Sequence, residues 1–158
     1  RKIYELVLAA QSAGIAAVKP GAKYRDINNA CMKVLAEGLQ DLGVLTISAE
    51  ESLKPENGLH RRWSVHASGH MLGLDVHDCA KARSDQYLDG VLEVGQVLTV
   101  EPGLYIQPDD QLFPAEFRGI GVRIEDDLLV TATGSENLSA MLPRTVSEIE
   151  AWIAELQK

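Results

Sequence analysis

Cysteine and long apolar runs are both scarce in this 158-residue sequence. Its two cysteines, Cys31 and Cys79, are too few for a disulfide framework, and neither has a second cysteine or a histidine at zinc-finger spacing. We therefore predict two free thiols and a reducing, cytoplasmic location. No stretch approaches the roughly 18 apolar residues of a membrane span, so no membrane association is expected.

Positive charge is also in short supply, with 15 basic residues against 23 acidic ones and a formal net charge of -8. A field of this sign repels phosphate backbones and anionic lipid surfaces, which excludes nucleic acid as a partner. The composition, 46% hydrophobic and 24% charged, is that of a folded globular protein. The length suffices for one domain with a real core.

Apolar residues recur at intervals of three and four in two segments near the start of the chain. The first stripe runs from Ile3 to Ala17 and ends at a Lys-Pro-Gly turn signal. The second runs from Ile27 to Leu39 and includes Cys31. We predict two amphipathic helices packed antiparallel or obliquely, with Cys31 as a small buried core residue rather than a nucleophile.

The later part of the chain is predicted to contain a loop, strands and a last helix. Residues 50–62 are polar and aperiodic, which predicts a loop. Segments 97–100 and 121–131 are rich in β-branched and apolar residues and are predicted to be strands, with Gly and Pro between them. Ser147 opens a capping-box pattern followed by an apolar stripe, which predicts a helix over residues 147–157.

Three of the four histidines, His66, His70 and His77, fall within twelve residues. Gly69 and Gly73 would weaken a helix here by roughly 1 kcal/mol each, so strand and turn are expected rather than a metal-binding helix. On a strand His66 and His70 share a face, and a bend near Gly73 could bring His77 to them. A single histidine would be interpreted as structural, but this density favours a functional site.

Two of the predicted strands deliver carboxylates. An apolar strand ends in Glu101, which the following proline holds extended. Arg123 and Glu125 share one face of the next alternating segment, whereas Asp126 and Asp127 are expected to form a solvated acidic strand end. One imidazole and two carboxylates from separate strands suit a hard divalent cation such as Mn²⁺, and the thiolates of structural zinc are missing.

Three motifs occur in order: H-x-x-x-H-x-x-G-x-x-x-H-D, V-E-P-G-L-Y and R-I-E-D-D. Together they resemble the pita-bread metallopeptidases, the family of methionine aminopeptidase, aminopeptidase P and prolidase. The insert over residues 106–123 is most similar to bacterial aminopeptidase P. The resemblance implies an α+β fold in which residues 1–158 form the C-terminal part of a single pita-bread catalytic domain, with helices packed on a curved antiparallel sheet.

The same resemblance implies a metal centre. His70, Glu101 and Glu125 would be ligands of two divalent metal ions, with Mn²⁺ expected and Glu125 bridging them. Glu101 would also act as a catalytic residue that shuttles a proton to the leaving proline nitrogen.

Four residues would work around that centre. His66 and His77 would line the substrate side, where His77 would act as a catalytic residue on the oxyanion that forms at the scissile carbonyl. Arg123 would hold the carboxylates in place, and Tyr105 would be a hydrogen-bond partner nearby.

The family pattern also requires two Asp ligands on strands before the first helix, and neither lies in this sequence. Asp26, Asp41 and Asp75 lack that motif context. We therefore expect the C-terminal part of a longer protein, with three of five ligands and no activity of its own. The parent would release the N-terminal residue from peptides with proline in second position, by attack of a metal-bridging hydroxide. Proline-containing peptides are the expected partners, and the full-length protein could form a homo-oligomer.

Two alternatives remain open at this point. A prolidase would perform the same chemistry on Xaa-Pro dipeptides only. A non-catalytic pita-bread module would bind proteins instead, although such modules generally lose the ligands that are present here.

Overall fold

The computed structural model describes residues 1–79 and 81–158. Its helices are α1 (Lys2–Ala17), α2 (Tyr24–Asp41), α3 (Ala49–Leu53) and α4 (Val146–Leu156), with 3₁₀ turns at Leu59–Arg62 and Ala115–Phe117. Its strands are β1 (Met71–Leu72), β2 (Val97–Val100), β3 (Gly103–Tyr105), β4 (Gly121–Arg123), β5 (Asp126–Thr131) and β6 (Gly134–Asn137). None of the described helices combines the length and hydropathy that crossing a bilayer requires.

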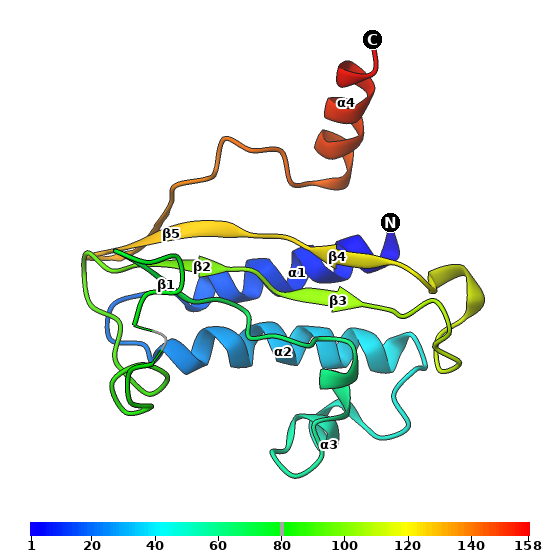
Figure 1. Cartoon of the computed structure of the whole chain (residues 1–158), viewed down its shortest axis with the longest axis horizontal. Coiled ribbons are helices and arrows are strands. Elements are labelled where there is room, and N and C mark those ends of the chain that lie inside the picture. Colours follow the sequence, from blue (N-terminus) through cyan, green and yellow to red (C-terminus); the bar gives the residue numbers. More distant parts are fainter. Residues whose placement is uncertain (80) are drawn as a thin grey trace.

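The described strands form two antiparallel sheets. One has four strands in the order β1-β2-β5-β6, and in the other β3 pairs with β4. Helices α1 and α2 run antiparallel to each other along one side of the strands (Figure 1). The α+β class and the antiparallel helix pair are therefore confirmed.

The two long helices cross closely because Gly14 stands at their contact. A Cβ atom at Gly14 would lie 2.5 Å from Cys31 Sγ and 2.8 Å from a methyl group of Val100, so a larger residue does not fit. Cys31 is buried, which raises the pKa of its thiol to about 11. Cys79 is exposed, and both cysteines are free, as predicted.

Two segments differ from the sequence-based expectation. The predicted loop over residues 50–62 contains α3, whose first turn is capped by Ser48 Oγ, and the 3₁₀ turn that follows it. The predicted strand over residues 121–131 is two strands, because the chain changes sheets at Ile124 and Glu125: β4 pairs with β3, and β5 pairs with β2.

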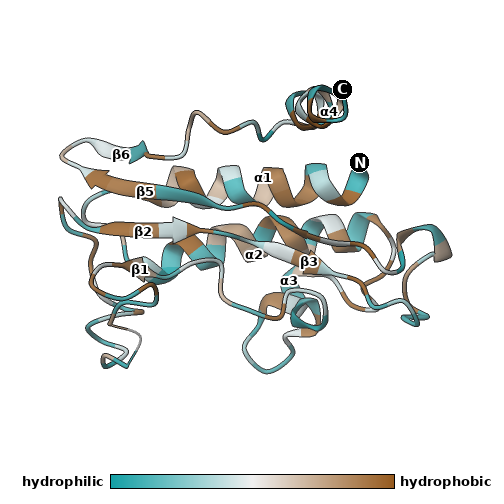
Figure 2. Cartoon of the chain, turned by 45° about the horizontal axis from the view of Figure 1, so that its top comes forward, coloured by the Kyte–Doolittle hydropathy of each residue, from teal (hydrophilic) through white to brown (hydrophobic). Residues whose placement is uncertain are grey.

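The last helix starts earlier than predicted and packs less. Thr145, not Ser147, is its N-cap: Thr145 Oγ1 accepts a hydrogen bond from Glu148 N at 3.3 Å, and the Glu148 carboxylate accepts one from Thr145 N at 2.9 Å. None of the α4 residues is buried. The helix stands outside the layer of α1 and the strands in both views (Figures 1 and 2), and an ion pair joins its Glu150 to Arg1.

The expectation for Asp126 was wrong. Its side chain is buried and accepts hydrogen bonds from Gln11 Nε2 at 2.9 Å and from the Arg144 guanidinium. A buried carboxylate requires such partners, and these come from α1 and from the segment before α4. Asp127, the next residue on β5, remains partly exposed.

Candidate metal centre

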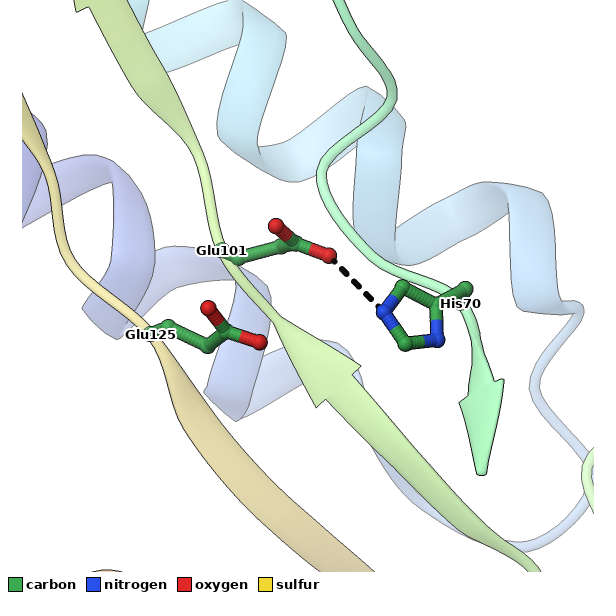
Figure 3. Close-up of side chains that lie close together, drawn as sticks. All are labelled: His70, Glu101 and Glu125. Carbon is green, nitrogen blue, oxygen red and sulfur yellow. Dashed lines mark ion pairs between the residues drawn. The ribbon is translucent and has the colours of Figure 1, made fainter. Parts of the chain in front are cut away.

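Three chain segments converge at the point where β2 and β4 end. The residue after β2 is Glu101, the residue before β1 is His70, and Glu125 lies between β4 and β5 (Figure 3). His70 Nε2 lies 3.3 Å from Glu101 Oε1, and one potential ligand atom from each residue lies within 4.8 Å of the others. The structure thus brings these three side chains together from positions far apart in the sequence.

Backbone pairing on both sides of β2 produces this convergence. On one side, Thr99 N donates to His70 O and Glu101 N donates to Ser68 O, each at 2.8 Å. On the other side, Val100 pairs with Asp126, which places Glu125 one step beyond the end of the ladder. Register therefore aligns the histidine and both carboxylates at one end of the strands.

The hydrogen bonds of His70 assign its tautomer. Its Nδ1 lies 3.0 Å from Met71 O, and a carbonyl oxygen only accepts, so we place the ring proton on Nδ1. The lone pair of Nε2 then faces the Glu101 carboxylate. Facing lone pairs repel unless a proton or a metal cation lies between them, and metal-bound histidines commonly donate the other ring N–H to a carbonyl in this way. The donor set therefore fits a divalent cation.

The electrostatics of the carboxylates fit the same interpretation. Partial burial raises the pKa of Glu125 above its usual range, and the charge of Glu101 raises it further. The Arg123 guanidinium offsets part of this repulsion, at 3.7 Å from Glu101 Oε2 and 3.8 Å from Glu125 Oε2. Arg123 thus lies beside both carboxylates. A metal ion bound between the carboxylates would reduce their mutual repulsion further.

His77 lies beside the cluster. The bend at Gly73 returns the chain so that Asp78 N donates to Met71 O at 3.1 Å. The His77 ring then meets the His70 ring edge-on, with 4.4 Å between centroids, and the His77 side chain remains exposed. An imidazole in this place can reach a molecule bound at the cluster.

His66 forms hydrogen bonds with residues outside the carboxylate cluster. Its Nδ1 contacts Ala67 O at 2.7 Å, which leaves Nε2 to accept from Tyr105 Oη, also at 2.7 Å. The His66 side chain also borders a cavity of about 410 Å³ between α2 and residues 64–69. Tyr105 is thus a hydrogen-bond partner of His66 rather than of the carboxylates.

The sequence reasoning missed Thr99. Its hydroxyl contacts both the backbone of His70 and the side chain of Glu101, each at 3.0 Å. The signal was present, because residues two apart on a strand share a face and Thr99 precedes Glu101 by two.

An α+β fold with a histidine and two carboxylates grouped at the ends of its strands is typical of the M24 class of metallopeptidases. The model of metallopeptidase family M24 matches residues 1–132, and the chain belongs to that family. Its curated relatives include Xaa-Pro aminopeptidase 1 of Streptomyces coelicolor, 60% identical over 99% of this chain and 32% of that protein. The Xaa-Pro aminopeptidase of Escherichia coli is 39% identical over the whole chain and 35% of that protein.

Solved structures agree with this assignment. The aminopeptidase PepP of Pseudomonas aeruginosa superposes with a TM-score of 0.90 at 42% identity, over 99% of this chain and 35% of that one. A zinc-substituted aminopeptidase P of E. coli in complex with product superposes with a TM-score of 0.89 at 39% identity, over the whole chain and 35% of that one. The predicted pita-bread fold is confirmed, and the chain spans about a third of the length of these relatives.

Proposed function

We propose that this chain supplies part of the active site of a metal-dependent aminopeptidase that releases the N-terminal residue from peptides with proline in second position. The observation that carries the proposal is the cluster of His70, Glu101 and Glu125, in which His70 Nε2 lies 3.3 Å from Glu101 Oε1. Alignment of almost the whole chain with Xaa-Pro aminopeptidases supports the substrate class.

The site would hold two divalent cations, and its oxygen-rich donors with one imidazole suit Mn²⁺. His70, Glu101 and Glu125 would be ligands here, and two Asp residues outside this sequence would complete the set. When bound, the ions would lower the pKa of a water molecule and polarise the scissile carbonyl. The free thiols of Cys31 and Cys79 support a reducing, cytoplasmic location as part of the same proposal.

The residues of this chain would transfer the proton, stabilise the negative charge on the substrate and position the ligands. Glu101 would accept a proton from the attacking water and pass it to the leaving proline nitrogen. His77, exposed beside His70, would donate a hydrogen bond to the substrate carbonyl oxygen as negative charge develops on it. Arg123 would keep the two carboxylates in place, and His66, oriented by Tyr105, would contact the substrate.

A chimaera tests this proposal. This chain would replace the matching segment of Xaa-Pro aminopeptidase 1 of S. coelicolor, which supplies the remainder of that protein. We expect release of the first residue from an Xaa-Pro tripeptide with Mn²⁺ present, and no activity from the isolated chain. The control is Glu136→Gln, an exposed glutamate on β6 outside the cluster, beside Glu125→Gln within it.

The outcomes separate the alternatives. Cleavage of Xaa-Pro dipeptides without cleavage of tripeptides would indicate a prolidase. A folded chimaera that binds no Mn²⁺ and cleaves neither substrate would refute the enzyme proposal and favour a protein-binding module. Equal activity of the Glu125→Gln and Glu136→Gln chimaeras would refute the assigned ligand set.

A further inference from the structure

We propose that Thr99 is a positioning residue that couples His70 to Glu101 and thereby sets the affinity of the site for its metal. The inference rests on the proposed metal function and adds to it a residue that neither binds metal nor touches substrate. Its hydroxyl is the link between two ligands that arrive from different segments of the chain.

The hydroxyl of Thr99 makes one contact with each of those segments. Thr99 Oγ1 accepts a hydrogen bond from His70 N at 3.0 Å and donates one to Glu101 Oε1 at 3.0 Å. The direction of both bonds is determined, because an amide N–H only donates and a carboxylate oxygen only accepts. The single hydroxyl proton is therefore committed to Glu101.

The backbone ladder explains why a side chain takes this role. Thr99 N donates to His70 O, and a regular antiparallel pair would return a bond from His70 N to Thr99 O. Instead, Thr99 O lies against Gly69, where a Cβ atom would be only 2.1 Å away. The hydroxyl replaces the carbonyl as the acceptor for His70 N, so glycine at position 69 and threonine at position 99 act together.

This arrangement has a consequence for both ligands. Thr99 is 1% exposed, so water does not readily replace its hydroxyl. The bond to Glu101 Oε1 restricts rotation of the carboxylate, and the bond to His70 N holds the backbone from which the imidazole projects. Hydrogen bonds that orient metal ligands commonly change metal affinity by about 10- to 100-fold when they are removed.

The experiment compares three substitutions in the chimaera. Thr99→Val removes the hydroxyl at nearly constant volume, Thr99→Ser keeps it, and Thr131→Val makes the same change on β5, away from the cluster. Mn²⁺ affinity is measured by titration calorimetry, and thermal stability by circular dichroism. Hydrogen exchange of the His70 amide, followed by NMR in the isolated chain without metal, reports the link independently of metal and of activity.

We expect Thr99→Val to bind Mn²⁺ about 10- to 100-fold more weakly and to exchange the His70 amide faster. Thr99→Ser should restore both properties, and Thr131→Val should change neither. Unchanged Mn²⁺ affinity of a folded Thr99→Val chimaera, even with a lower melting temperature, would overturn the proposal, because it indicates a structural role alone. Failure of Thr99→Ser to restore affinity would overturn it as well.

The proposal and the underlying function can fail separately. A wild-type chimaera that binds no Mn²⁺ removes the metal function and this inference together. A chimaera that binds Mn²⁺ and cleaves Xaa-Pro tripeptides, but whose affinity does not depend on Thr99, overturns only this inference.

Discussion

Replacing Asp126 with alanine should destabilise the fold strongly although Asp126 is not a proposed ligand. The substitution removes the partner of Gln11 Nε2, and Gln11 is fully buried with its Oε1 atom already lacking a partner among the described residues. An orphaned buried amide costs about 1–3 kcal/mol, and a lost bond to a charged group costs about 1.5–3 kcal/mol. The Arg144 side chain is 39% exposed, so water can solvate its guanidinium after the substitution and offset part of the cost of the lost ion pair.

These terms predict a loss of about 2–4 kcal/mol in the free energy of unfolding. For a chain of this size that corresponds to a fall in melting temperature of roughly 4–16 °C. Urea unfolding followed by circular dichroism measures the loss. The matched control is Asp127→Ala, at the partly exposed neighbouring position, which should change stability by less than about 0.5 kcal/mol. Equal effects of the two substitutions would refute the reasoning.

Three further predictions concern the site, the thiols and acid stability. In the chimaera, His77→Ala should lower kcat by roughly 100- to 1,000-fold with metal retained, whereas His70→Ala should lose metal and activity together; the reverse pattern would exchange their roles. Ellman's reagent should modify Cys79 in the native chain and Cys31 only after unfolding, and equal rates would contradict the burial of Cys31. Burial raises the pKa of Asp110, but hydrogen bonds from an indole, a backbone amide and a guanidinium outweigh it and leave this pKa below the usual range. Asp110 therefore stabilises the fold above its unfolded pKa and stops doing so as pH falls through its folded pKa. Asp110→Asn should flatten the loss of stability that urea titrations show below about pH 5, and an equally steep loss in the variant would contradict this assignment.

Local patterns were sufficient for much of the fold. The stripes from Ile3 to Ala17 and from Ile27 to Leu39 predicted both long helices, because helix periodicity is a property of neighbouring residues. The motifs around His70, Glu101 and Glu125 indicated the family, which the comparison confirmed. The role of these three residues as ligands stays a prediction that the chimaera tests.

Tertiary structure decided what depends on partners distant in the sequence. Asp126 looks solvent-exposed in sequence, and its burial depends on Gln11, 115 positions earlier. Thr99 looks like an ordinary strand residue until pairing places His70 beside it. Side-chain type and spacing therefore determined the two long helices, strand β2 and the candidate donors, because these are short-range properties. Which polar groups are buried, and which hydroxyl links the candidate ligands, follows from strand register and packing, which bring together groups that no local pattern relates.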